Sequence, residues 1–119
     1  MKLIAPLLKI QNQLRIYHWQ SETYAQHKAF GKTYEALDGL VDEFVEVFMG
    51  KNGKTQAAVT YNFELGNLDE NYHEVINSYI DFLTEFNNLF SAETDSDLLN
   101  IRDEMLATLH RLKYLLTLQ

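Results

Sequence analysis

Histidines and carboxylates are the residues of this chain whose types could support metal chemistry. The four histidines are His18, His27, His73 and His110. The densest group of acidic residues consists of Glu35, Asp38, Asp42, Glu43 and Glu46. Imidazole and carboxylate ligands without sulfur suit Fe(II), Mn(II) or Zn(II), and the sequence contains no cysteine. Metal binding through nitrogen and oxygen atoms is therefore the first chemistry that these residues indicate.

The spacing of these residues places part of the set on one face of a helix. At about 100° per residue, His27, Asp38 and Asp42 fall within about 60° of one another on a helical wheel. Glu46 lies about 40° beyond Asp42 on the same wheel. Clustered like charges repel one another and lose solvation beside apolar groups, unless a cation or a partner intervenes. The face is either a metal-binding surface or a partly solvated acidic edge with ordinary ion pairs.

Residues 14–50 also carry a distinctive series of motifs. In chain order they are His18-Trp19, His27-Lys28-Ala29-Phe30, Tyr34 and Asp42-Glu43-Phe44-Val45-Glu46. This series resembles the first half of Dps proteins, the ferritin-like DNA-binding proteins from starved cells. That family carries a His-Trp pair near the end of its first helix, and its second helix carries a histidine followed by an Asp-Glu-x-x-Glu group. The segment is also similar to small uncharacterised proteins of phages and large DNA viruses, a likeness that brings no known activity.

The resemblance to Dps implies an iron site that two subunits share. His18 and His27 of one subunit would be nitrogen ligands, and Asp42 and Glu46 of a neighbouring subunit would offset the charge of the metal. The resemblance also implies a homodimer or a larger homo-oligomer, and a ferroxidase reaction in which peroxide or dioxygen oxidises Fe(II). Gly31 stands where the family has a further acidic ligand. We therefore expect a single weak iron position instead of a tight pair.

A second interpretation keeps the helices without the chemistry. In it the protein is a non-catalytic dimeric structural or interaction module, of a kind that a phage could encode. His18 would lie at the edge of the core, bonded to a backbone carbonyl, and His27 would pair with a carboxylate of the next subunit. The Glu70-x-x-His73 spacing also occurs in di-iron carboxylate proteins, but Glu70 is expected to cap a helix. His110, followed by Arg111 and Lys113, is expected to be exposed or favoured by the dipole near the end of the last helix.

Apolar periodicity predicts four helices that position these residues. The expected helices cover residues 3 to about 21, about 23 to 49, 67 to 90, and 94 to nearly the end of the chain. The last two open on the predicted capping boxes 67–70 and 94–97. Residues 54–66 are expected to form a connection with at most one short helical turn. This order predicts an all-α, antiparallel four-helix bundle, ferritin-like with one long crossover between the second and third helices, as a single domain over residues 1–119.

Composition limits the other functions that this chain could have. Hydrophobic residues make up 46% of the sequence, enough for one core, and the formal net charge is −7. A negative surface without a basic patch repels phosphates, so binding to nucleic acid is not expected. No stretch approaches the roughly 20 apolar residues that span a bilayer. We therefore expect a soluble, cytoplasmic protein without a membrane partner.

Overall fold

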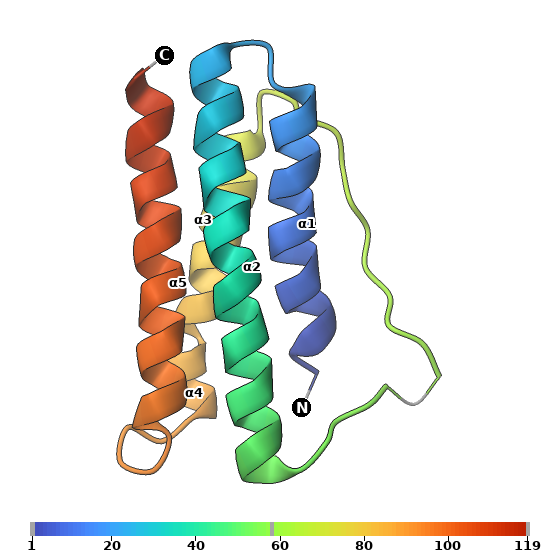
Figure 1. Cartoon of the computed structure of the whole chain (residues 1–119), viewed down its shortest axis with the longest axis vertical. Helices are drawn as coiled ribbons and strands as arrows, with labels where there is room; N and C mark the ends of the chain where they lie inside the picture. The colour runs from blue at the N-terminus through green and yellow to red at the C-terminus, as the bar shows by residue number, and fades with distance from the viewer. Residues whose placement is uncertain (1, 58, 119) are drawn as a thin grey trace.

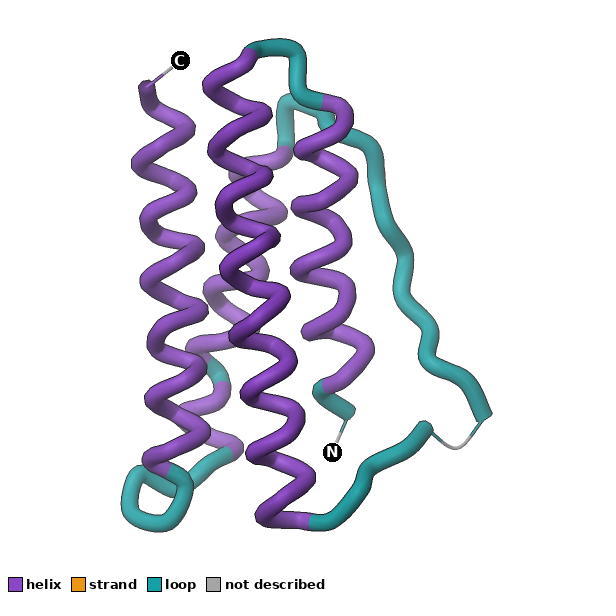
Figure 2. The backbone as a smooth tube through the Cα atoms, viewed as in Figure 1, coloured by secondary structure: helices purple, strands orange, loops and turns teal. Residues whose placement is uncertain are grey.

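Helices joined by loops make up the part of the chain that the structure describes. This computed structural model describes residues 2–57 and 59–118, and no strand occurs among them (Figure 2). Its elements are α1 (Ile4–Gln20), α2 (Tyr24–Asn52), α3 (Tyr72–Thr84), α4 (Phe86–Leu89), α5 (Ser96–Leu115) and the 3₁₀ helix η1 (Leu116–Leu118). The connection between α2 and α3 returns along the length of the bundle, so α3 runs in the same direction as α2, while α1 and α5 run the opposite way (Figure 1). The predicted all-α fold of four helices with one long crossover is confirmed, with α3 and α4 together forming the third helix.

Apolar side chains at helical spacing meet between these helices in one core. Fully buried members include Leu14 from α1, Phe44 from α2, Leu83 from α3 and Leu109 from α5. Tyr24 was expected on the buried face of the second helix, but its side chain is 74% exposed. The prediction was wrong because Tyr24 is the first residue of α2 and lies at the end of the bundle. No helix in the described residues is long and apolar enough to cross a membrane.

The starts of the last two helices differ from the predicted capping boxes. α3 begins at Tyr72, five residues after Asn67, whose Oδ1 accepts a hydrogen bond from the side chain of Gln20 on α1 (2.8 Å). At the start of α5, the carboxylate of Asp97 accepts from Lys51 at the end of α2 (2.8 Å), and Asp95 makes no side-chain capping bond. Both predicted boxes were therefore wrong, because Asn67 and Asp97 bond to side chains of other helices. Glu70 is left without the capping role assigned to it.

The crossover is extended and carries no helical turn in its described residues. Its end is fixed to α1 by the buried side-chain amide of Gln13. That amide donates to the Gly66 carbonyl (2.8 Å) and accepts from the Gly66 N–H (2.7 Å). Gln20 adds a second anchor, since its Oε1 accepts from the Leu68 N–H (2.6 Å). Two glutamines of α1 thus fix the point from which α3 begins.

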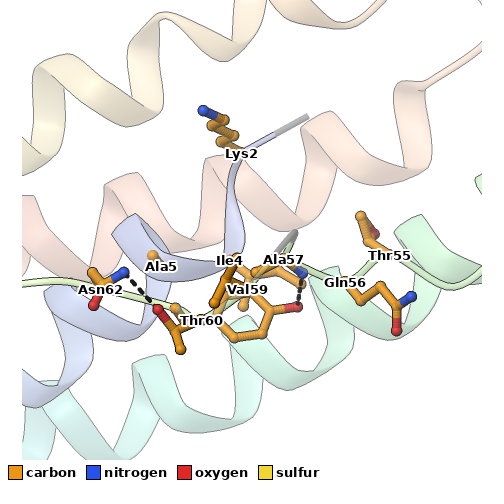
Figure 3. A pocket seen from close by; sticks show the side chains of 10 residues that line it. Lys2, Ile4, Ala5, Thr55, Gln56, Ala57, Val59, Thr60 and Asn62 are labelled. Carbon is orange, nitrogen blue, oxygen red and sulfur yellow. Dashed lines mark hydrogen bonds between the residues drawn. The ribbon is translucent and has the colours of Figure 1, made fainter.

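The first half of the crossover stands away from the start of α1. A hollow of about 630 Å³ lies between them, and Lys2, Ile4 and Ala5 form its helical wall (Figure 3). The hydroxyl of Tyr61 accepts a hydrogen bond from the Ala57 N–H (3.1 Å). Tyr61 was expected in the core, but its side chain is 46% exposed because it belongs to this extended segment. The lining has no histidine or carboxylate, so we place the candidate functional site elsewhere.

Tyr79 on α3 supports a prediction about stability. Its side chain is only 7% exposed, and its hydroxyl has no hydrogen-bond partner in the described part of the chain. Burying a polar group without a partner costs about 1–3 kcal/mol. We therefore expect Tyr79→Phe to raise the free energy of unfolding by about 1 kcal/mol, measured by urea denaturation. Tyr114→Phe, at an exposed tyrosine of α5, is the matched control and should change little.

The same burial makes stability depend on pH in the alkaline range. Burial, followed by the nearby Tyr17, raises the pKa of Tyr79. A folded-state pKa above the unfolded value, about 10 for tyrosine, gives stability that is present below that value. This stability decreases as the pH rises past it, and Tyr79→Phe should lose less stability there than the wild type. An equal alkaline loss in both proteins would contradict this assignment.

Candidate functional site

His18 and His27 come together where α1 turns into α2. Their imidazole rings stack with centroids 3.8 Å apart and an interplanar angle of 22°. The Nδ1 atom of His18 lies 2.7 Å from the carbonyl oxygen of His27, and Nδ1 of His27 lies 3.0 Å from the carbonyl oxygen of His18. The two residues are therefore linked reciprocally, each side chain to the backbone of the other.

This exchange fixes the tautomer of both rings. A carbonyl oxygen can only accept a hydrogen bond, so Nδ1 of each histidine must carry the proton and donate it. In the neutral ring, Nε2 is then the nitrogen with a free lone pair. Histidines that bind metals usually have this arrangement, with the other ring nitrogen donating to a carbonyl or carboxylate. The expected bond from His18 to a backbone carbonyl is confirmed, and it leaves Nε2 available.

Gly31 makes room for this pair. A Cβ atom at position 31 would lie 2.7 Å from Cε1 of His18 and 2.8 Å from its Nδ1. Those distances are far below van der Waals contact, so the His18 ring occupies the space that a side chain at position 31 would need. The glycine that departs from the Dps pattern is thus explained by packing. An acidic ligand cannot stand there while His18 keeps this position.

Two further side chains extend the cluster along the interface of α1 and α2. The ring of Tyr34 meets the His18 ring edge-on, with centroids 5.3 Å apart. The guanidinium of Arg15 lies over the Tyr34 ring, 4.8 Å from its centroid. A cation over an aromatic face is attracted by the ring quadrupole. The cluster ties the position of His18 to residues on both helices.

A hollow of about 600 Å³ lies beside the histidine pair. Besides His18 and His27, α2 contributes Lys28, Lys32 and Glu35, and the C-terminal end of the chain contributes Leu115 and Leu118. Its walls combine imidazole, ammonium and carboxylate groups with apolar side chains. The hollow could receive a polar group of another molecule next to the histidines.

The carboxylates that the sequence linked to the histidines lie elsewhere on the chain. Asp42 and Glu46 are exposed on the C-terminal half of α2. At 1.5 Å per residue, Asp42 is about 22 Å from His27 along the helix. The carboxylate of Asp38, between them, accepts a hydrogen bond from the side chain of Gln11 on α1 (2.8 Å). One chain therefore brings the histidines together but not the complete predicted ligand set.

The remaining candidates form no site within the described residues. Glu70, His73 and His110 are all exposed. The His73 ring packs on Tyr72, with centroids 4.2 Å apart. No group of three or more histidine, aspartate or glutamate residues in the described part of the chain could hold a metal ion.

Sequence reasoning missed one residue at the hollow. Glu35 was counted among the acidic residues but was given no role, although it lines the hollow together with His27 and Gly31. The signal was present, because residues four and eight positions apart lie on one side of a helix. The places of Leu115 and Leu118 could not have been found this way, since α5 reaches the hollow only through tertiary packing.

One family matches most of the chain. The model of a family of unknown function, DUF5856, covers residues 18–116. No curated protein and no solved structure matches the sequence. The matched segment begins at His18 and contains both histidines, the carboxylates of α2 and the residues that line the hollow except Leu118.

Proposed function

The chain belongs to the DUF5856 family, whose function is unknown, and we propose that it binds Fe(II) at a site shared by two copies of the chain. His18 and His27 of one copy supply imidazole nitrogens, and Asp42 and Glu46 of a second copy supply carboxylate oxygens. The observation that carries the proposal is the reciprocal bonding of the histidines, which fixes Nδ1 as the protonated nitrogen of both rings. The resemblance of residues 14–50 to Dps supports the same four ligands.

The chemistry of the donors fits this metal. Imidazole together with carboxylate suits Fe(II), and neutral imidazoles alone leave both positive charges of the ion without compensation. The carboxylates of Asp42 and Glu46 offset that charge when a second copy presents them. The packing of His18 against Gly31 leaves no room for a ligand side chain at position 31. We therefore expect one weak position for each histidine pair.

In a ferroxidase reaction Fe(II) would be the substrate. Each Fe(II) would lose one electron to peroxide or dioxygen, and the carboxylates would favour the product because its charge is higher. The formal net charge of −7 raises the local concentration of cations near the surface. A cytoplasmic location, which is compatible with a sequence without cysteine, would supply reduced iron.

Anaerobic titration with Fe(II) tests the proposal. We expect the metal-free wild type to bind Fe(II), and the double variant Asp42→Ala, Glu46→Ala to bind it at least about 10-fold more weakly. Asp81→Ala, Glu104→Ala is the matched control, because it removes the same charge from exposed positions on α3 and α5. The control should bind like the wild type. Failure of the wild type to bind Fe(II) would overturn the proposal. An equal loss of Fe(II) affinity in both double variants would show that net charge, and not these two carboxylates, determines binding.

A second function is favoured by one observation. The reciprocal hydrogen bonds of His18 and His27 satisfy both Nδ1 atoms without a metal, as expected if the two histidines have only a structural role. In this case the protein is a non-catalytic dimeric interaction module. Sedimentation in EDTA distinguishes the two proposed functions. If the protein is an interaction module, the double variant His18→Ala, His27→Ala should associate more weakly than the wild type even without metal. The association of the wild type should then not change when Fe(II) is added.

A further inference from the structure

The outward face of α2 carries opposite charges in its two halves. Lys28 and Lys32 lie in the N-terminal half, and Asp42, Glu43 and Glu46 lie in the C-terminal half. All five side chains are exposed, as is Glu35, which adds one negative charge to the N-terminal half of the same face. Within the described residues, ion pairs involve other side chains, and none of these five takes part in one. The exposed charges on this face of α2 therefore differ in sign between its two ends. None of these five charges has an ionic partner among the described residues.

This arrangement is unfavourable for an isolated helix. Lys28 and Lys32 are four residues apart, as are Asp42 and Glu46, and like charges at this spacing destabilise a helix. Opposite charges four apart would have stabilised it instead. In Figure 1, α2 lies in front with α1 and α5 on either side and α3 behind, so no helix of the chain covers its front. The missing countercharges must come from solvent ions or from another molecule.

We propose that a second copy of the chain supplies them, through antiparallel contact of the two α2 helices about a two-fold axis near residue 37. Lys28 and Glu46 lie on one line of the helix surface, because the residues between them make about five full turns. A two-fold axis midway between them places Lys28 opposite the partner's Glu46. The same axis brings Lys32 next to the partner's Glu43. Each contact occurs twice, as in any isologous dimer.

Each of the two edges of this face meets the same edge of the partner across the two-fold axis. The edge next to α5 carries Lys32, which lines the hollow with Leu115 and Leu118. On a helical wheel Glu43 falls on the same edge, within about 20° of Lys32. The edge next to α1 carries Asp42, on the side where Asp38 bonds to α1. The two-fold axis places each edge of α2 against the same edge of the partner's α2 and reverses the direction of the helix. The acidic end of the partner's α2 therefore lies against the basic end of α2 in this copy.

The middle of the face allows the helices to approach. Gly39 lies beside the axis, and a Cβ atom built there meets nothing within 4 Å. Its exposed neighbour Ala36 is also small. Small side chains let two helix backbones come close. The hollow of about 600 Å³ at the basic end then lies where the acidic end of the partner docks.

This inference deepens the proposed function by naming the surface through which the second copy reaches the histidines. Asp42 of the partner lies on the edge next to α1, which is the edge that carries His18 and His27. The association itself rests on the charge pattern and requires no metal. Dimerisation in EDTA and Fe(II) binding are therefore separate measurements, and either can fail while the other succeeds.

Charge reversal in two complementary variants tests the register. Variant A carries Lys28→Glu, Lys32→Glu, and variant B carries Glu43→Lys, Glu46→Lys. Alone, each variant brings like charges together at every predicted contact. Mixed in equal amounts, A and B restore opposite charges at all of them. Lys2→Glu, Lys54→Glu is the matched control, because it changes the net charge as variant A does but at exposed positions away from α2.

Sedimentation equilibrium in EDTA at low salt is the measurement. We expect the wild type and the control to dimerise, with an affinity that falls as salt rises, while A and B alone associate at least about 10-fold more weakly. The mixture of A and B should regain the association of the wild type as a heterodimer. A wild type that stays monomeric at about 100 μM would overturn the inference. So would variants that dimerise normally, or a mixture no better than its components.

A result that separates the two proposals is equally clear. If the dimer behaves as expected but no Fe(II) binds, the interface stands and the metal site is wrong. If Fe(II) binds while A and B associate like the wild type, the metal site stands and this interface is wrong.

Discussion

Replacing Gly31 by alanine should destabilise the protein, although the same change in a helix normally stabilises it. Alanine favours a helix over glycine by about 1 kcal/mol. At position 31, however, the new Cβ would lie 2.7 Å from Cε1 of His18. The ring cannot withdraw freely, because it is bonded to the His27 carbonyl and stacked on the His27 ring. Overpacking of this kind costs about 1–3 kcal/mol, so after the gain in helix propensity we expect a net loss of about 1 kcal/mol in the free energy of unfolding.

Gly39→Ala is the matched control for this prediction. Gly39 lies on the same helix, and a Cβ atom there has nothing within 4 Å. We expect this variant to gain about 0.5–1 kcal/mol from helix propensity. Urea denaturation of the two variants gives both values. If both glycines respond with the same sign, the His18 ring does not occupy the space beside Gly31.

The Gly31 variant also tests the candidate site without removing a ligand. All four proposed ligands remain in Gly31→Ala, but His18 must leave its bond to the His27 carbonyl. We therefore expect weaker Fe(II) binding in this variant than in the wild type. Imidazole ¹⁵N spectra should show that the Nδ1 protons of His18 and His27 lose their protection.

Replacing Arg102 by methionine should cause the largest loss of stability among the polar residues of the core. Arg102 on α5 is only 5% exposed. Its guanidinium donates to the Leu83 carbonyl (2.8 Å), to Oδ1 of Asn87 (2.7 Å) and to the carboxylate of Asp103 (2.9 Å). These contacts join α5 to the segment where α3 ends and α4 begins. Because the break at Glu85 interrupts the predicted third helix, this segment depends on a donor from elsewhere in the chain.

Arg102→Met keeps most of the volume and removes all of these donors. We expect the free energy of unfolding to fall by about 3 kcal/mol, measured by urea denaturation. Asp103→Ala is the control, since it removes only the most exposed partner, whose side chain is 60% exposed, and should cost less than about 1 kcal/mol. An Arg102 variant as stable as the control would show that the buried guanidinium does not hold the break in place.

The sequence predicted well those features that depend on local periodicity. Leu7, Ile10, Leu14 and Tyr17 repeat at spacings of three and four, and all are buried on α1. This pattern is enough to predict a helix and its inner face, because side chains at this spacing share one side. The same reasoning identified the long crossover, since residues 54–66 lack the pattern. The histidines and carboxylates stay a prediction of metal ligands, because that prediction depends on residue type.

Helix ends were predicted less well, because several donors compete for each polar side chain. Asp97 of the predicted second capping box instead accepts a hydrogen bond from Lys51 at the end of α2 (2.8 Å). This bond lowers the pKa of Asp97 and raises that of Lys51. Local sequence could not reveal a partner so distant along the chain. Tyr61 was misplaced for a related reason, since its spacing from other aromatics coincides with a helical pattern although its segment is extended.

The sequence by itself determined which faces of the helices are apolar and the order of the helices, and it named the residue types that suit a metal. Only the tertiary structure decided that His18 and His27 exchange hydrogen bonds and that the His18 ring fills the space beside Gly31. It also decided that Asp42 lies too far along α2 to reach the two histidines of the same chain. The physical reason is that residue chemistry and helical periodicity are local properties. Contacts between α1 and α2 depend instead on how the turn between them sets one helix against the other.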